Sequence, residues 1–311
     1  MVFLNKRTNL SIFLIFFISA CQIENSVNLD DGPQKQVIDE NIRFEKYLSN
    51  QWEQNLKDSP IFASLLGNKS FNQEITSNSI EEFFKNKAKL QKDLINLNRF
   101  NYEKLNSDNK LNYKLKRITL NNSIEAAEYP SYYMSLNQRG GVQSYYETGD
   151  RLVYESKQDY EDWLIRLSKY ADNIANTKTN VEEGLEKGYT QPQLVTRQVI
   201  LQIDNILNSE IVDNPYLKIF LTADNSFFNK GEKEDLINRA TLLIKSQIIP
   251  AYVDLNNFLK NTYLPNSRSS IGLNGVPGGD KWYEYAARYH TTTDLTPDEI
   301  HDIGLKEVLR I

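Results

Sequence analysis

The sequence is poor in the residues that build disulfides and metal sites. It contains one cysteine, Cys21, and two histidines, His290 and His301, in 311 residues. A single cysteine excludes a disulfide within the chain. The sequence also lacks His-Glu-x-x-His and Cys-x-x-Cys, the spacings typical of zinc sites. We therefore expect no metal site and no bound cofactor in these residues.

Other catalytic motifs are missing too. There is no Gly-x-Ser-x-Gly elbow, which weakens the case for a serine hydrolase, although a Ser-His-Asp triad is assembled in space and needs no fixed spacing. The glycine-rich run 275–281 lacks the Gly-Lys-Ser/Thr ending of a phosphate loop, and Pro277 favours a plain turn. Carboxylates are plentiful, but nothing in the sequence selects a catalytic pair.

The chain has no surplus of positive charge. Lys and Arg number 36 against 41 Asp and Glu, so the formal net charge is −5. Both signs are interspersed along the chain, and no basic stripe is visible. Nucleic acid is therefore excluded as an expected partner. A chain of this length buries roughly three quarters of its unfolded surface, so it needs neither disulfides nor a structural metal to fold.

No apolar run is long enough to span a membrane, but the N-terminus resembles an export signal. Lys6 and Arg7 precede an apolar stretch over residues 10–18, about half of the ~20 residues that a membrane helix needs. Ser19-Ala20 then leads to Cys21. We therefore interpret residues 1–20 as a signal peptide, and residues 21–36, which are polar, as a tether.

The segment Ile18-Ser19-Ala20-Cys21 resembles the lipobox of bacterial lipoproteins. This resemblance implies a diacylglycerol on Cys21 and therefore membrane lipid as a partner, since two acyl chains give stable anchoring. An ordinary signal peptide with an incidental Cys21 is the alternative. Gln22 stands where an Asp commonly marks inner-membrane retention in Gram-negative bacteria. We therefore predict a lipid-anchored protein of the cell envelope, and Gln22 favours the outer membrane over the inner membrane.

Residues 37–311 show mainly helical periodicity. Phe44, Leu48, Trp52 and Leu56 recur at steps of four, and Pro250 predicts a kink in a long helix. Thr296-Pro297-Asp298-Glu299 reads as a capping box that opens the last helix. The other helices are expected over about residues 80–99, 108–127, 157–174, from Thr190 onward, and 232–262. The fold class is therefore mainly α, with a small β component.

Three segments do not show this periodicity. Residues 129–154 and 264–280 are expected to be loops, the first with short extended pieces. Residues 282–293 become β-branched toward their end, which favours a strand. His290 would then lie at a strand end, either as a hydrogen-bonding residue or as a substrate contact. His301 could pair with Asp298 one turn earlier, although a solvated helix face is the simpler interpretation.

The last helix, residues 297–311, has no C-cap glycine and no closing basic turn. Ile311 is in phase with the apolar positions before it. We interpret this pattern as a sequence that is cut short, and the alternative is that this helix docks as the last element.

Several segments stand out between about residues 59 and 311. One runs from Tyr289 to Leu305, YHTTTDLTPDEIHDIGL. The others are Ser59–Gly67, Asn137–Gln143, Asp159–Leu167, and Gly184–Gly188 with Pro192. Together and in the same order, these segments resemble the bacterial domain-of-unknown-function family 885, and Tyr289–Leu305 is the most specific of them. The family contains many exported lipoproteins and is similar to zinc metallopeptidases of the thermolysin-like clan.

The resemblance implies the helical N-terminal part of a zincin-like fold. Members of the family run to about twice this length, and their zinc helix lies well after the Thr-Thr-Thr segment. Zinc is therefore expected for the full-length protein, and its ligands have no counterpart here. The segment Tyr285–Thr293 resembles part of the family's cleft wall, which makes Tyr285 and His290 candidates for substrate contact.

Two hypotheses of function follow. The first is the N-terminal half of a membrane-anchored peptidase-like hydrolase that takes peptides, inactive as these 311 residues alone. The second is a lipid-anchored binding or scaffold protein that performs no chemistry.

Overall fold

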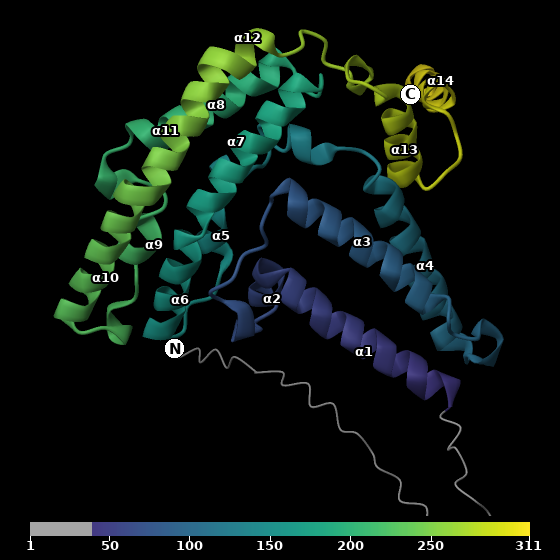
Figure 1. The fold of residues 1–311 in the computed structure, drawn as a ribbon, viewed down its shortest axis with the longest axis horizontal. Coiled ribbons are helices and arrows are strands. Elements are labelled where there is room, and N and C mark those ends of the chain that lie inside the picture. Colours follow the sequence, from purple (N-terminus) through teal and green to yellow (C-terminus); the bar gives the residue numbers. More distant parts are fainter. Residues whose placement is uncertain (1–38) are drawn as a thin grey trace, which may run out of the picture. The chain divides into compact units, whose positions relative to one another are not determined.

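A computed structural model describes residues 39–311, and this part of the chain is mainly α-helical, as predicted (Figure 1). Its only β structure is a pair of isolated bridges, Asn137 with Gly140 and Pro192 with Arg268. The predicted signal peptide 1–20, the tether 21–36 and Cys21 lie outside the described residues. The α-helices are α1 (Glu40–Asp58), α2 (Pro60–Leu65), α3 (Ile80–Leu97), α4 (Ser107–Ala126), α5 (Tyr146–Arg151), α6 (Lys157–Ser168), α7 (Tyr170–Glu186), α8 (Gln193–Asn208), α9 (Lys218–Leu221), α10 (Lys230–Leu243), α11 (Ile249–Phe258), α12 (Leu264–Asn266), α13 (Gly279–Thr291) and α14 (Pro297–Arg310).

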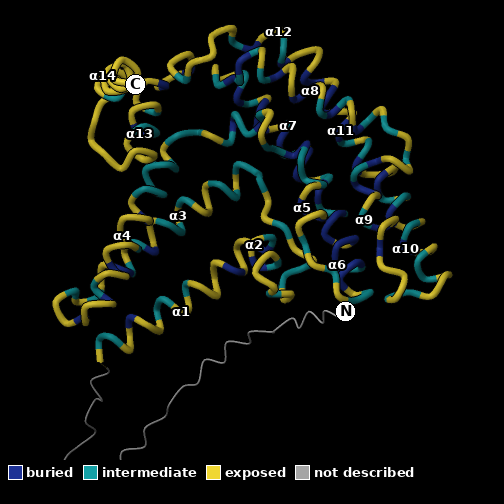
Figure 2. The backbone as a smooth tube through the Cα atoms, turned by 180° about the vertical axis from the view of Figure 1, so that it is seen from behind, coloured by how far each residue is buried: buried dark blue, intermediate teal, exposed yellow. Residues whose placement is uncertain are grey.

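Helices α1, α3 and α4 share a small core. Its buried members are Phe44, Leu97, Leu105, Tyr113 and Leu120. Of the predicted stripe on α1, Phe44 and Leu56 are buried, whereas Trp52 remains 47% exposed and meets Phe62 edge to face. Figure 2 shows α1 and α3 coloured largely as exposed or intermediate. The small core therefore covers only one narrow side of these helices.

A much larger core lies among α6, α7, α8, α10 and α11. The apolar stripe predicted after Ser156 is confirmed, since Trp163, Leu167, Tyr170 and Ile174 are all buried. The chain forms two helices here rather than one, because α6 ends at Ser168 and α7 begins at Tyr170. The break leaves the stripe continuous, so both helices pack against the same core.

Beside the apolar stripe, α6 and α7 carry a second buried stripe, and this one is polar. Arg166, Asn173, Thr177 and Asn180 are each at most 4% exposed. They bind the connector between α2 and α3, residues 66–79, mostly through its backbone. Asn173 Nδ2 donates to the Thr76 carbonyl at 3.0 Å, and Asn180 Nδ2 donates to the Asn78 carbonyl at 2.8 Å. Arg166, Asn173, Thr177 and Asn180, with the connector, are called the polar seam below.

Pro250 is accommodated by a wide helical turn. The residues Ile244–Ile248 form a π-helical turn between α10 and α11, and Pro250 is the second residue of α11. A second π-helical turn, Leu259–Tyr263, directly precedes Pro265 in α12. A proline lacks the N–H and crowds the carbonyl four residues earlier, and a π turn at that point removes the conflict. The interruption expected near Pro250 is therefore a local widening of the helix.

The wide turns also keep one face toward the core. The buried residues Ile244, Ile248, Tyr252, Leu255, Leu259 and Tyr263 recur mostly at steps of four. In a regular α-helix this spacing would rotate the last of them by about 100° away from the first. Because a π turn holds more residues per turn, the two insertions counteract this rotation.

Two predictions about the non-helical segments are wrong. Residues 282–293 form no strand, because α13 spans Gly279–Thr291, and its aromatic residues lie at helical spacing. The segment 129–154 contains short 3₁₀ helices and α5 instead of extended pieces, apart from the Asn137–Gly140 bridge. Residues 267–278 are a loop with one 3₁₀ turn, so that expectation is largely confirmed. The predicted capping box of α14 is confirmed, since Glu299 N donates to Thr296 Oγ1 at 3.2 Å.

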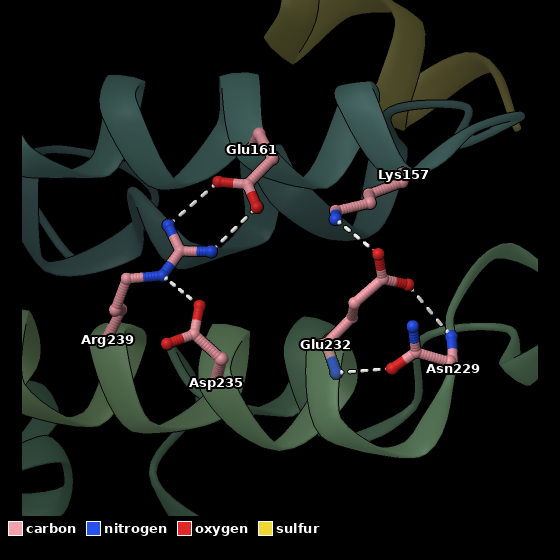
Figure 3. A network of polar contacts seen from close by, with 6 residues as sticks. All are labelled: Lys157, Glu161, Asn229, Glu232, Asp235 and Arg239. Carbon is pink, nitrogen blue, oxygen red and sulfur yellow. Dashed lines mark hydrogen bonds and ion pairs between the residues drawn. The ribbon is translucent and has the colours of Figure 1, made fainter.

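A network of charged side chains joins α6 to α10 (Figure 3). Arg239 binds both carboxylate oxygens of Glu161, at 2.8 and 2.6 Å, and its Nε donates to Asp235 at 2.7 Å. Lys157 pairs with Glu232 at 3.0 Å, and Glu232 also forms the capping box of α10 with Asn229. The planar two-point contact fixes geometry better than a single ion pair.

Replacing Glu161 with Gln is expected to lower the free energy of unfolding by about 1 kcal/mol, because the two-point contact with Arg239 is lost. The loss should shrink in 1 M NaCl, since the pair is partly exposed. Urea denaturation of both proteins at low and high salt measures it. The control is Glu53→Gln on α1, a residue with no ion pair within residues 39–311. Equal effects of the two substitutions would contradict the role given to the network.

A buried pair of tyrosines ties α11 to the segment before α5. Tyr252 Oη donates to the Val142 carbonyl at 2.6 Å and lies 2.6 Å from Tyr216 Oη. Burial raises the pKa of both hydroxyls above the ordinary value, so both stay neutral donors.

We expect Tyr252→Phe to cost about 1–3 kcal/mol of unfolding free energy, because it leaves the buried Tyr216 hydroxyl without its partner and removes one of the hydrogen bonds that the Val142 carbonyl accepts. The measurement is chemical denaturation, with Tyr283→Phe on the exposed side of α13 as the matched control. A change below about 0.5 kcal/mol would show that water replaces the lost hydroxyl.

Candidate functional site

The two residues proposed for substrate contact, Tyr285 and His290, lie on the same helix and line the same groove. The groove runs between α4 and α13 and has a volume of about 350 Å³. It is lined by Asn122, Ser123, Ala126, Trp282, Tyr285, Ala286, Tyr289 and His290. The structure therefore brings Tyr285 and His290 together, on a helix rather than at a strand end.

Helix α13 is held in place by stacked aromatic rings. Tyr129, three residues past the end of α4, stacks on Trp282 with a centroid distance of 5.5 Å and on Tyr285 at 5.1 Å. Tyr129 Oη also donates to the Lys281 carbonyl at 3.2 Å. At the start of α13, Gly279 approaches Leu273 so closely that a Cβ would lie 2.0 Å from its carbonyl oxygen. Only glycine permits that approach, which fixes where α13 begins.

Tyr285 forms the floor of the groove. It is 9% exposed, and its hydroxyl donates to the Asn122 carbonyl on α4 at 3.2 Å. Burial, with Tyr289 and Glu125 nearby, raises the pKa of Tyr285, so the phenol remains neutral. An ion pair between Arg288 and Glu125 adds a second link between α13 and α4. Since its hydroxyl is already used, Tyr285 can offer a ligand mainly its ring.

His290 and Tyr289 form the rim. Both are exposed, and their rings meet edge to face at 5.1 Å. His290 makes no hydrogen bond to any residue within 39–311, so both of its ring nitrogens are available to a ligand. Ser123 and His290 both line the groove, and no hydrogen bond joins them in the described part of the chain. The arrangement therefore supports binding through ring faces and imidazole hydrogen bonds.

The described residues do not supply a zinc site. His301 lies exposed on α14, and no ion pair joins it to Asp298 among residues 39–311, which fits the solvated helix face. No group of three or more His, Cys, Asp or Glu side chains within this range is placed to hold a metal ion. The zinc chemistry implied by the resemblance therefore finds no donor set here, and no catalytic step is assigned to these residues.

The aromatic stack is not predictable from the sequence as a whole, although the residues that α13 contributes to it lie at helical spacing. Trp282, Tyr285 and Tyr289 stand at i, i+3 and i+7, which is a helical pattern. Their partner Tyr129 lies about 150 positions earlier and carries no local signal. Among the helices of residues 39–311, none combines the length and apolar content that crossing a membrane requires.

One solved structure shares the fold over most of the chain. It is titled "The crystal structure of the putative lipoprotein from Colwellia psychrerythraea", with a TM-score of 0.76 and 17% identity. The match covers 88% of this chain and 50% of the other, so this chain spans about half the length of that protein. No curated protein sequence matches the chain.

The family comparison is more specific. Residues 60–311 match the sequence profile described as "Bacterial protein of unknown function (DUF885)". This range contains the groove, α6, α7 and the polar seam, and it agrees with the extent of the resemblance seen in the sequence. The chain belongs to the DUF885 family of bacterial proteins.

Proposed function

We propose that these residues form the substrate-binding half of a lipid-anchored, peptidase-like protein of the cell envelope, most consistent with the outer membrane. The observation that carries the proposal is the groove between α4 and α13. It has a floor of stacked rings and a rim with two exposed side chains, Tyr289 and His290. Such a surface suits a peptide, because apolar side chains pack on ring faces while a ring nitrogen binds a backbone carbonyl.

The residues that line the groove support a role in binding a substrate rather than in catalysing its reaction. They provide rings, an amide, a serine and one imidazole, without a set of metal ligands. If zinc acts in the whole protein, it would polarise a peptide carbonyl and activate water. The described residues would bind and orient the peptide. We therefore expect these 311 residues to bind peptides without hydrolysing them.

Binding can be measured with fluorescein-labelled hexapeptides that contain one central Phe or Leu, by fluorescence anisotropy. Tyr289→Ala and His290→Ala should each weaken binding about five- to tenfold, since each removes about 1 kcal/mol of contact. Tyr283→Ala is the matched control, because Tyr283 is 53% exposed on the same helix and does not line the groove. Mass spectrometry of the same mixtures should show intact peptides.

Two results would contradict this proposal. Equal weakening by Tyr283→Ala would mean that the groove is not the binding surface. Cleavage of the peptides by the 311-residue chain would mean that the chemistry is present in it after all.

The lipid anchor depends on Cys21, which lies outside the described residues. Expression in a Gram-negative host should place the wild-type chain in the outer-membrane fraction, with the mass of a diacylglycerol on its N-terminal peptide. Cys21→Ser should release the chain from the membrane fraction, because serine cannot carry the diacylglycerol that supplies both anchoring acyl chains. A wild-type chain that carries no lipid mass and leaves the membrane fraction, like the Cys21→Ser chain, would favour the ordinary signal peptide.

A further inference from the structure

Positive charge gathers around the start of α4, although the chain as a whole is acidic. Residues 99–118 contain six Lys or Arg and two Asp or Glu, a formal charge of +4 within a chain of −5. Of the two acids, Glu103 pairs with Lys110 at 3.3 Å, and Asp108 lies in the first turn of α4, where a helix favours an acidic residue. The excess of positive charge in this segment is therefore not neutralised locally.

One face of α4 is apolar and exposed. Leu111, Leu115 and Ile118 are 57%, 53% and 56% exposed, and at 100° per residue they lie within about 60° of one another around the helix. Tyr113 and Leu120, which α4 buries in the small core, lie on the opposite side of the helix. Leu111, Leu115 and Ile118 are called the α4 stripe below. Helix α4 thus has a second apolar face that the small core does not use.

Basic side chains follow the α4 stripe along one edge. Lys110, Lys114 and Arg117 lie at the same helical spacing beside it, and they are called the basic edge below. Lys110 and Lys114 lie over the ring of Tyr102, with Nζ at 5.3 and 5.7 Å from its centroid. Lys114 and Arg117 are exposed and form no ion pair within residues 39–311. Their charges are therefore available to an anionic partner.

The same end of α4 lies where the chain arrives from its N-terminus. Asn106 N, at the start of α4, donates to Asn41 Oδ1 in the first turn of α1 at 2.8 Å. The neighbouring Ile42 is 61% exposed and adds to the apolar surface. Asp39 stands 18 positions after Cys21, so a fully extended chain reaches at most about 65 Å from a lipid on Cys21 to this end. A lipid anchor would therefore keep the start of α4 near the membrane.

Helix α13 limits which part of α4 can meet a flat surface. Asn122 and Glu125 are in phase with the α4 stripe, and α13 contacts both through Tyr285 and Arg288 (Figure 1). A surface that touched the whole length of α4 would collide with α13. The first three turns of α4 stay accessible, and they contain the α4 stripe and the basic edge.

We propose that the start of α4 docks on a leaflet of anionic phospholipid, with Leu111 and Leu115 in the interface and the basic edge on the headgroups. An apolar stripe beside Lys and Arg is typical of helices that bind membrane interfaces, and basic segments next to an anchor bind anionic lipid. A second copy of the chain fits less well, because two such faces would bring like charges together. The proposal rests on the lipid anchor at Cys21, which holds this end near the membrane.

Fluorescence quenching tests the docking on the full chain, anchored in vesicles of phosphatidylcholine alone or with about one third phosphatidylglycerol. Cys21 is the only cysteine, and the lipid blocks it, so Leu111→Cys offers a single site for a fluorophore. Nitroxide-labelled lipid should quench this label about threefold in anionic vesicles and little in neutral ones. The label of Ile118→Cys, one position nearer to α13, should be quenched less. Leu201→Cys on α8 is the matched control, since Leu201 is 54% exposed, and its label should stay unquenched.

Removing charge tests the basic edge. Lys114→Ser with Arg117→Ser should reduce the quenching of the Leu111→Cys label in anionic vesicles to the level in neutral vesicles. Lys245→Ser with Arg197→Ser is the matched control, because both residues are exposed and form no ion pair in the described part of the chain. The difference between anionic and neutral vesicles should shrink in 1 M NaCl, since salt screens headgroup charge. Circular dichroism confirms that each variant is folded.

The docking proposal is overturned if the Leu111→Cys label is quenched no more than the Leu201→Cys label, or if the two double charge variants behave alike. An emission shift that grows with protein concentration and is not quenched by nitroxide lipid would mean that a second copy covers the α4 stripe, which also overturns it.

Failure of the anchor gives a different result. The wild-type chain would then not float with neutral vesicles, and Cys21 would react with the fluorophore. The Leu111→Cys label should in that case be measured in the Cys21→Ser background, with anionic vesicles added to the solution. Quenching there would support the docking surface without the anchor, and its absence would overturn both proposals.

Discussion

The arrangement of the whole helical unit depends on how one buried guanidinium binds backbone carbonyls. Arg166 holds residues 64–74 against α6, and the polar seam continues this contact along α7 with Asn173 and Asn180. The small core of α1, α3 and α4 has only five buried members among the described residues. The polar seam attaches it to the larger core through directional hydrogen bonds. Ring contacts that run from Phe83 of α3 to Tyr132 and Tyr133 add to this attachment. Such bonds fix one register, because a shifted connector would leave several buried polar groups unpaired.

The same logic explains where the groove lies. It is built where α13 meets Tyr129, a residue far away in sequence, through a few specific contacts. The residues that line the groove do not belong to the large apolar core. Contacts of this kind leave room beside them, since rings and long polar side chains span gaps that aliphatic packing would close.

The sequence was a good guide to helices and a poor guide to their partners. The bounds of α3, α4 and α14 were predicted within a few residues, because periodicity and capping are local signals. Residues 282–293 were assigned to a strand because three consecutive threonines outweighed the aromatic spacing. Tyr285 and His290 came from a family resemblance, and their groove was not foreseeable since Tyr129 gives no local signal. The polar seam was equally hidden, because a buried polar stripe has the same sequence pattern as a solvated one.

The two π-helical turns around α11 have a consequence for how this part of the chain can vary. A π turn is an α-helix that holds one additional residue, and the surplus sits at Ile244–Ile248 and at Leu259–Tyr263. The helix therefore has two places where its length can change by one residue while the backbone remains helical. Loss of a residue at one place would rotate everything beyond it by about 100°, which would turn Tyr252 or Tyr263 away from the core. Each π turn is followed by a proline, whose ring is accommodated by the wider turn. The surplus residue is also needed to keep Tyr252 and Tyr263 facing the core.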